Sequence, residues 1–206
     1  MIINWYGQTC FKIIVQGDKG PVDMFIDPFE KEIGLRPPRI DENSIVIFSE
    51  IDKKFLGSKF VITGPGEYDT NGICIQGINA PAKNKERTTI FLIKAEDIKI
   101  CHLGFLGEKG FAEKEIEEIG DVDILMLPVG GAKSIDAKDA LEVMSQIEPK
   151  ITIPMYYSLP GLKEKIDGLD KFLKSLGIKS PLALPKLSVK KKDLSQDEAK
   201  IVVLQP

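Results

Sequence analysis

The chain of 206 residues contains one histidine, His102, and this count limits the chemistry that its side chains can perform. Histidine is the commonest metal ligand in proteins because its imidazole offers a neutral nitrogen near physiological pH. Catalytic zinc sites usually take three protein ligands and a water molecule, and sites with two metal ions need more ligands. The sequence therefore excludes a zinc centre built from histidines.

Three cysteines, Cys10, Cys74 and Cys101, are the next candidates for metal chemistry. Their number is odd, and no two of them have the CxxC spacing of zinc sites. Each lies in an apolar segment typical of a strand, so we predict three buried free thiols in a reducing cytosol. A zinc site built from cysteines is disfavoured for the same reasons.

Glu50 and Asp52 are separated by one residue and could together hold a hard cation such as Mg²⁺ or Ca²⁺, which prefers oxygen ligands. The alternative is that both are solvated loop carboxylates, one of them paired with Lys53 or Lys54. We favour this alternative, because two carboxylates beside two lysines make a poor cation site. The residues thus predict no bound metal ion.

His102 itself has two interpretations. It could act as a general base for Tyr156 or for a nearby serine. It could instead be a buried histidine that is hydrogen-bonded to the backbone. The second interpretation is favoured, because the sequence contains no recognisable Ser/His/Asp or Cys/His arrangement.

Length, composition and charge exclude several classes of protein. Hydrophobic residues make up 43% of the chain and charged residues 29%, as in an ordinary globular protein, and the length suits one domain over 1–206. The formal net charge of −3 argues against a general affinity for nucleic acid. No apolar run is long enough to span a membrane, and the N-terminal residues lack signal-peptide features. We therefore expect a cytoplasmic protein that binds neither nucleic acid nor membranes.

The hydrophobic pattern predicts strands in the first half of the chain, then alternating helices and strands. The predicted strands are 10–15, 22–26, 45–48, 60–62, 73–76, 89–93, 98–101, 123–127 and 151–154. The predicted helices are 112–119, one that begins after Asp136 and ends before Pro149, and 169–176, with Gly177 following. Residues 187–204 are predicted to close the fold as a β-hairpin. This order needs helices that cover sheet faces, which predicts a layered α/β or α+β domain.

Six sequence blocks, in order, resemble the metallo-β-lactamase superfamily. They are WYGQTCFKI (5–13), IDPF (26–29), GPGEY (64–68), HLG (102–104), LPVGG (127–131) and IPMYY (153–157). The resemblance covers residues 2–177 and is strongest to small bacterial metal-dependent hydrolases similar to ascorbate-6-phosphate lactonases. It implies an α/β fold, an αββα four-layer sandwich, with the site where loops converge at the sheet edges. In that family the site would hold Zn, Mn or Fe.

The resemblance also implies where metal ligands would lie, and this chain differs at each matched position. The family motif HxHxDH matches VIFSEIDKKF (46–55), so Glu50 and Asp52 stand for two histidines, Lys54 for the aspartate and Phe55 for the last histidine. A further ligand histidine would lie near Ala82. The bridging aspartate matches Phe105, and the final histidine matches Tyr156. The family counterpart of His102 lies beside the site and is not a ligand.

These differences predict a degenerate member of the family, without bound zinc, cofactor or hydrolase activity, that acts as a binding or interaction module. The alternative is a metal-dependent hydrolase with a rebuilt oxygen-ligand site around Glu50 and Asp52. Association with an active paralogue and a homo-oligomer are both left open. Asp27, Gly66 and Gly104 are predicted to support the loops, Asp27 by accepting hydrogen bonds and the glycines by allowing tight turns.

Overall fold

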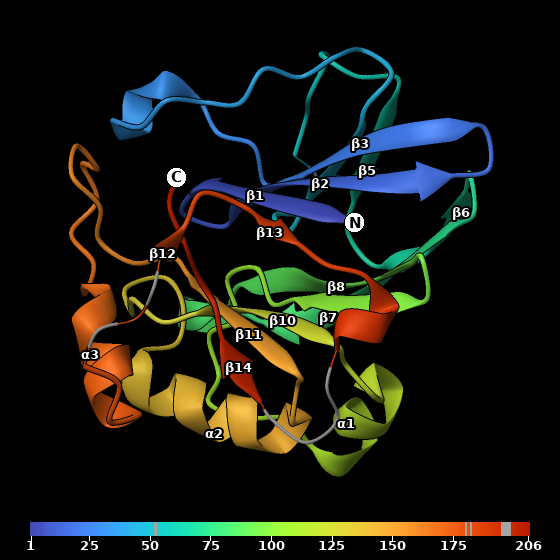
Figure 1. Ribbon diagram of the computed structural model, residues 1–206. Helices are drawn as coiled ribbons and strands as arrows, with labels where there is room; N and C mark the ends of the chain where they lie inside the picture. The colour runs from blue at the N-terminus through green and yellow to red at the C-terminus, as the bar shows by residue number, and fades with distance from the viewer. Residues whose placement is uncertain (52, 180, 182, 195–198) are drawn as a thin grey trace.

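The structure is a computed structural model that describes residues 1–51, 53–179, 181, 183–194 and 199–206. Its strands form two large sheets that lie face to face (Figure 1). The first sheet has the strand order β13-β1-β2-β3-β4-β5. Its strands are β1 (Ile2–Gly7), β2 (Cys10–Gly17), β3 (Gly20–Ile26), β4 (Ile45–Phe48), β5 (Phe60–Thr63) and β13 (Leu187–Ser188).

The second large sheet has the order β14-β11-β10-β9-β8-β7-β6. Its strands are β6 (Gly66–Thr70), β7 (Ile73–Pro81), β8 (Arg87–Ala95), β9 (Ile98–His102), β10 (Ile124–Pro128), β11 (Ile151–Met155) and β14 (Lys200–Ile201). A small parallel pair, β12 (Ala183–Leu184) and β15 (Val203–Leu204), completes the strands of the described residues. The predicted strands from 10–15 to 151–154 are thereby confirmed, while β1, β6 and β12 were not predicted.

The core lies between the two sheets because the strands alternate inward and outward side chains. In β1 and β2 the inward residues Ile3, Trp5, Phe11 and Ile13 are almost completely buried. Each such side chain contributes about 1.5–3 kcal/mol by its removal from water. In contrast, β10 is buried along its whole length because helices cover its outer face.

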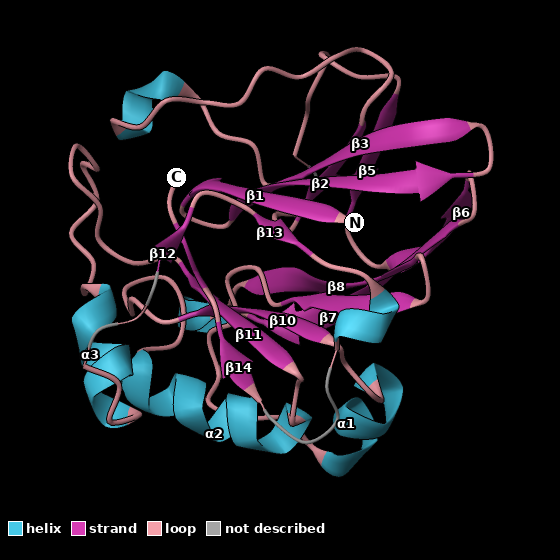
Figure 2. Cartoon of the chain, in the orientation of Figure 1, coloured by secondary structure: helices cyan, strands magenta, loops and turns pink. Residues whose placement is uncertain are grey.

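The described residues form three α-helices, which lie against the second sheet (Figure 2): α1 (Glu113–Ile119), α2 (Ala137–Ile147) and α3 (Leu169–Ser175). The Asp136 carboxylate accepts the N–H groups of Lys138 (2.9 Å) and Asp139 (3.0 Å), which confirms Asp136 as the N-cap of α2. Gly177 follows α3 with φ +70°. The α/β sandwich predicted for the chain is confirmed, although loops and the short 3₁₀ helix η1 (Lys31–Ile33) flank the first sheet.

The predicted hairpin over 187–204 is wrong. Strand β13 pairs antiparallel with β1 in the first sheet, whereas β14 pairs parallel with β11 in the second sheet. Between them lies the 3₁₀ helix η3 (Lys191–Asp193). Each tail segment completes the edge of a different sheet, because those edges offer unpaired backbone groups that a local hairpin would leave unused. The tail therefore joins the two layers.

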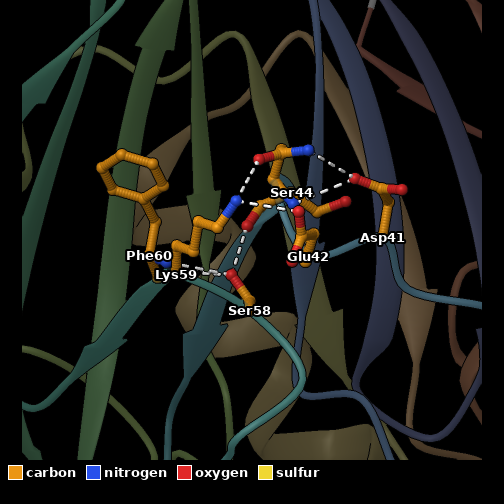
Figure 3. Close-up of polar contacts among 7 residues, drawn as sticks. Asp41, Glu42, Ser44, Ser58, Lys59 and Phe60 are labelled. Atoms are coloured by element: carbon orange, nitrogen blue, oxygen red, sulfur yellow. Dashed lines mark hydrogen bonds and ion pairs between the residues drawn. The ribbon is translucent and has the colours of Figure 1, made fainter.

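Polar contacts close the base of the segment that carries the matched motif residues (Figure 3). The Lys59 ammonium donates to Glu42 Oε1 at 2.8 Å and to Asn43 Oδ1 at 3.1 Å, and the Ser58 hydroxyl donates to the Ser44 carbonyl at 2.5 Å. Figure 3 shows the ring of Phe60 pointing away from this cluster. The contacts join residues 42–44 to residues 58 and 59, so they connect the chain on either side of the matched motif residues.

Parallel strands bring the other site segments to that same edge. Strands β3, β4 and β5 are parallel neighbours in the first sheet, and β9, β10 and β11 are parallel neighbours in the second. The residues after their carboxyl ends therefore gather together, as in other sheets with parallel strands. Asp27 follows β3, Ser49 follows β4, and Tyr156 follows β11.

No helix among the described residues has both the length and the apolar character needed to cross a bilayer.

Candidate functional site

A cleft of about 310 Å³ opens where these strand ends converge. Six residues predicted from the sequence line it: Asp27, Glu50, Lys54, Phe55, Phe105 and Tyr156. The sequence left undecided whether this cleft is open or filled. The structure shows an open cleft that side chains line. The predicted residue Asp52 lies outside the described residues.

An aromatic pair forms one wall of the cleft. The rings of Phe105 and Tyr156 meet edge to face, with centroids 5.5 Å apart and planes at 85°. This is a favoured geometry for aromatic pairs, worth about 0.5–1.5 kcal/mol beyond the burial of area. A second pair, Phe48 and Phe55, packs with centroids 5.8 Å apart. Three of the five aromatic residues that line the cleft, Phe55, Phe105 and Tyr156, lie at positions that the sequence analysis matched to metal ligands.

The Tyr156 hydroxyl is engaged by Glu164, a residue that the sequence analysis missed. It donates to Glu164 Oε1 at 2.9 Å. Burial, together with this carboxylate, raises the pKa of Tyr156 well above its usual value, so the phenol stays protonated. Tyr156 is therefore held as a hydrogen-bond donor to Glu164, and it is not a base or a metal ligand in this arrangement.

Two more side chains that the sequence analysis missed, Gln8 and Lys133, surround Glu164. The amide of Gln8 donates to Glu164 Oε2 at 3.2 Å, and the Lys133 ammonium lies 4.0 Å from Glu164 Oε1. All three residues line the cleft. No sequence motif connects them, because Gln8, Lys133 and Glu164 come together only when three separate loops meet at the sheet edge.

Asp27 supports the loop after β4, as predicted. Its Oδ1 accepts the backbone N–H of Ser49 at 2.6 Å, and its own N–H donates to the Ile47 carbonyl at 2.8 Å. Burial raises the pKa of Asp27 to about 6, and the hydrogen bonds from Ser49 oppose this effect. Asp27 thus joins the first sheet to the motif segment from beneath the cleft.

Glu50 behaves as a solvated loop carboxylate. It is exposed, and Lys53 Nζ lies 3.0 Å from its Oε2. This confirms the predicted pairing with a neighbouring lysine, which weakens the case for a hard cation at this position. A surface ion pair of this kind contributes only about 0–1 kcal/mol to folding.

His102 is completely buried beneath the cleft and does not line it. Its Nε2 lies 2.9 Å from the Thr9 carbonyl, and its Nδ1 accepts the backbone N–H of Gly104 at 3.2 Å. These partners assign the neutral tautomer with the proton on Nε2. Burial lowers the pKa of His102 to about 4, so the ring stays neutral at pH 7. The buried histidine favoured by the sequence is confirmed, and the general base for Tyr156 is wrong.

The donors around the cleft do not fit the metal centre of the family. At the matched positions that the structure describes, the chain offers the Glu50 carboxylate paired with Lys53, the ammonium of Lys54, the rings of Phe55 and Phe105, and a phenol that is bonded to Glu164. Asp27 Oδ2 and Gln8 Oε1 are buried without a partner, but two oxygens fall short of the ligand sets of metal ions. Among the described residues no three His, Cys, Asp or Glu side chains form a metal-binding group.

The backbone around the cleft is strained. Gln8, Asp27 and Tyr156 all line it, and all have left-handed conformations with φ of 52°, 46° and 52°. Such a conformation costs a non-glycine residue about 1–3 kcal/mol, and strained residues gather at functional sites. The surrounding packing therefore holds these three residues in conformations that non-glycine residues seldom adopt.

Gly104 and Gly66 both have positive φ values, +51° and +154°, as expected for glycines at tight turns. A Cβ on residue 104 would lie 2.5 Å from Ser49 Oγ and 2.6 Å from Ser49 Cβ. A Cβ on residue 66 would lie 3.0 Å from the Tyr68 hydroxyl oxygen. Gly104 is therefore required both by its φ and by the close approach of β9 to the motif segment.

We predict that Gly104→Ala lowers the free energy of unfolding by about 3 kcal/mol, from the left-handed φ and the clash with Ser49. Gly177→Ala is the matched control, because Gly177 has φ +70° but a Cβ added there would meet no atom within 4 Å. The control is expected to lose about 1 kcal/mol. Urea unfolding measures both values, and equal losses would contradict the role of the close approach.

The predicted burial of the three cysteines is correct for Cys10 and Cys101 and wrong for Cys74. Cys74 lies on the outward side of β7, where alternate residues of the strand face away from the core. Its Sγ lies 3.1 Å from Asp69 Oδ2. The apolar pattern thus located the strand correctly, but it did not show which side chains point to the core and which to solvent.

Known proteins were compared with the chain and with its structure. The Beta-lactamase superfamily domain matches residues 2–156. A UPF0173 protein of Pyrococcus abyssi is 24% identical over 187 residues, covering 78% of this chain and 85% of the relative. A UPF0173 metal-dependent hydrolase of Staphylothermus marinus is 26% identical over 193 residues, covering 76% and 83%.

A crystal structure from Thermotoga maritima superimposes with a TM-score of 0.79 and 31% identity, covering 98% of this chain and 97% of that chain. That protein is described as a candidate Zn-dependent hydrolase of the metallo-beta-lactamase superfamily. The resemblance to ascorbate-6-phosphate lactonases is untested by these matches and stays a prediction. The matched domain and the agreement over nearly the whole fold show that the chain belongs to the metallo-β-lactamase superfamily.

Proposed function

We propose that this protein is a member of the superfamily without the metal-dependent hydrolase activity of its relatives, and that its cleft binds a small organic molecule. The observation that carries this proposal is the contact between Phe105, Tyr156 and Glu164. It occupies two positions matched to metal ligands, yet a cleft of about 310 Å³ remains open beside it. These side chains thus stand where the resemblance implies ligands, and space for a molecule remains beside them.

Charge supports the loss of metal binding. Lys54 and Lys133 line the cleft, and two divalent ions bound there would be repelled by both ammonium groups. Glu164 accepts two hydrogen bonds, and Glu50 pairs with Lys53. Asp27 is engaged through Oδ1 alone, so Asp27 Oδ2 is the buried carboxylate oxygen left without a partner among the described residues. Rearranging these groups around a metal ion would leave Tyr156 and Lys53 without their partners.

The lining supports an organic ligand with an apolar body and a polar group. Ligand sites in proteins combine apolar walls with a few converging polar side chains. Here Phe55 and Phe105 offer apolar surface, while Lys133 and Glu164 offer opposite charges close together. The three strained residues of the lining add support, because packing maintains their conformations at the cleft.

A cytoplasmic location is part of the proposal. All three cysteines are free thiols, and Cys74 is exposed. Exposed free thiols persist in reducing compartments and are oxidised elsewhere.

The first test is metal analysis of protein purified without chelator. We expect less than about 0.1 equivalent of zinc, manganese or iron per chain, before and after dialysis against Zn²⁺. A near-stoichiometric content of any of these metals would refute the proposal. Hydrolysis of phosphodiester, lactone or phosphate-ester substrates with added Mg²⁺ or Mn²⁺, lost on Glu50→Gln, would instead support the rebuilt oxygen-ligand site.

The second test is a thermal-shift screen of small aromatic and aliphatic acids and amines. Compounds that bind the cleft should lose at least tenfold in affinity on Phe105→Ala, a change on the order of 1.4 kcal/mol. Phe60→Ala is the matched control, because Phe60 is 53% exposed and does not line the cleft. Equal losses in both variants, or an absence of any bound compound, would count against a ligand site.

A further inference from the structure

We infer that a second cavity, on the outer face of the first sheet, binds a small molecule that carries a multiply charged oxyanion, a phosphate or a polycarboxylate. The cavity has a volume of about 780 Å³, a size suited to a metabolite. Its lining includes Tyr6, Lys12, Arg36, Arg39 and Pro160. None of these residues lines the cleft, so this site is independent of the proposed function.

The charged side chains that line this cavity are all cationic. Lys12 is partly neutralised, since its Nζ lies 2.6 Å from Asp23 Oδ2. Within the described part of the chain, no hydrogen bond or ion pair engages the guanidinium of Arg36 or of Arg39, and Pro206 at the rim forms no ion pair with them. In contrast, the cleft mixes Glu50 and Glu164 with its lysines. Side chains of one charge sign along a cavity are complementary to an anion.

The choice of arginine at both positions indicates oxyanion recognition. Of the 28 basic side chains in the sequence only three are arginines, and two of these are Arg36 and Arg39. A guanidinium presents a planar fork of N–H donors that matches carboxylate and phosphate in pairs of hydrogen bonds, whereas an ammonium acts as a point charge. Nearly all other basic residues of the chain are lysines. Two arginines at one cavity therefore indicate that the paired N–H donors of the guanidinium group bind an oxyanion there.

The sequence between the arginines directs both side chains to one side. Pro37 and Pro38 fix their own φ angles, and each proline also forces the residue before it into an extended conformation. An extended polyproline helix has three residues per turn, so residues 36 and 39 lie on one face about 9 Å apart. Both residues do line the cavity. Their spacing is thus set largely by the backbone before any ligand arrives.

The start of this segment is anchored to the neighbouring loop. The Lys163 N–H donates to the Ile33 carbonyl at 2.9 Å. Gly34 has φ +95°, and a Cβ there would lie 2.0 Å from the Gly161 carbonyl oxygen. This close approach fixes the point from which residues 35–39 extend. An anchored segment loses less conformational freedom on binding, which favours affinity.

The rest of the lining suits the organic part of such a ligand. Leu35 and Pro160 supply apolar surface, and the Tyr6 hydroxyl, which has no partner among the described residues, is available as a donor. Lys12 is held in place by its contact with Asp23 and by the Phe25 ring, whose centroid lies 5.4 Å from Nζ. The cavity therefore offers a fork of donors, an additional cation and an apolar wall.

Calorimetric titration with inorganic phosphate and with citrate tests this site, and it distinguishes the two oxyanion classes. At least one of the two is expected to bind with a dissociation constant of about 1 mM or below at low ionic strength. The double variant Arg36→Lys/Arg39→Lys keeps the charge but removes both forks, and its affinity should fall at least tenfold, a change on the order of 1.4 kcal/mol. Both side chains are exposed, so the variant is expected to fold like the wild type.

Arg87→Lys is the matched control, because Arg87 is the third arginine and donates to Asn79 Oδ1 at 2.9 Å away from this cavity. It should bind the probes like the wild type. Amide NMR shifts on titration should change at Tyr6 and Leu35 and not at Tyr156. Unchanged affinity in the double variant, or no binding of either probe at about 10 mM, would overturn the inference.

Discussion

Replacement of Asp123 by asparagine is expected to lower the free energy of unfolding by about 1.5–3 kcal/mol, because a buried carboxylate loses its charge-assisted hydrogen bonds to two partly exposed lysines. Asp123 is 5% exposed and lies just before β10. Its Oδ1 accepts from Lys150 Nζ at 2.7 Å, its Oδ2 accepts from Lys191 Nζ at 2.7 Å, and the Lys99 N–H donates to Oδ2 at 2.9 Å. The variant would leave two lysines partly buried without a counter-ion.

The same cluster holds the C-terminal segment. Lys191 belongs to η3, which lies between the two tail strands, so its bond to Asp123 fixes the tail to the second sheet. Burial by itself raises the pKa of Asp123, but the bonds from Lys150 and Lys191 outweigh it and hold the pKa below its usual value. A lowered carboxyl pKa stabilises the fold at neutral pH, and this contribution is lost as pH falls below about 4.

Urea unfolding at pH 7 measures this loss. Asp121→Asn is the matched control, since Asp121 is exposed and lies two residues before Asp123. Both residues line a surface cavity beside β6 and β7. The control should change stability by less than about 0.5 kcal/mol. The Lys191 side chain is 47% exposed, so solvent screening is expected to weaken its ion pair with Asp123. Lys150→Met should therefore lower the free energy of unfolding more than Lys191→Met. Equal stability of Asp123→Asn and Asp121→Asn would contradict the cluster as a support of the fold.

The second large effect is the response to pH of Asp27→Asn. Burial raises the pKa of Asp27 from 3.8 to about 6, so the folded state binds more protons than the unfolded state between these values. The contribution of Asp27 to stability therefore falls by about 3 kcal/mol as pH rises through this window. Asparagine keeps an oxygen acceptor for the Ser49 N–H and tolerates the φ of +46°, so the variant should fold and be more stable at pH 7.

His102 titrates over an overlapping range with the opposite sign. Burial lowers its pKa from 6.5 to about 4, so the unfolded state binds more protons in this range and stability falls as pH decreases. The two groups partly cancel in the wild type. The prediction is accordingly a difference: the stability of Asp27→Asn relative to the wild type should rise by about 3 kcal/mol from pH 4 to pH 7.

Urea unfolding at several pH values between 4 and 7 tests this difference, with Asp121→Asn again as the control. The control should follow the wild-type profile, because Asp121 is exposed. Parallel profiles for Asp27→Asn and the wild type would show that Asp27 does not titrate within the window. The comparison assumes two-state unfolding. The slope of the unfolding free energy against urea concentration should therefore be the same at every pH.

The sequence by itself predicted the strands of the core and the caps of α2 and α3, because these depend on local patterns. Alternating apolar residues locate a strand, and Asp136 or Gly177 locates a helix end, without reference to the rest of the chain. The same reasoning overlooked β1, although Ile3 and Trp5 alternate with outward residues over six positions. It was wrong for Cys74, since the pattern shows a strand but not which neighbours cover each face.

The resemblance of six blocks to one family predicted which residues would meet, and the structure brings Asp27, Phe105 and Tyr156 to one cleft. It could not predict Glu164, Gln8 or Lys133, which complete the cleft from loops with no shared motif. Nor could it predict that 187–188 and 200–201 complete the edges of different sheets. Residue types and local periodicity determine the elements, whereas contacts between distant segments depend on how the two sheets pack and which edges remain unpaired.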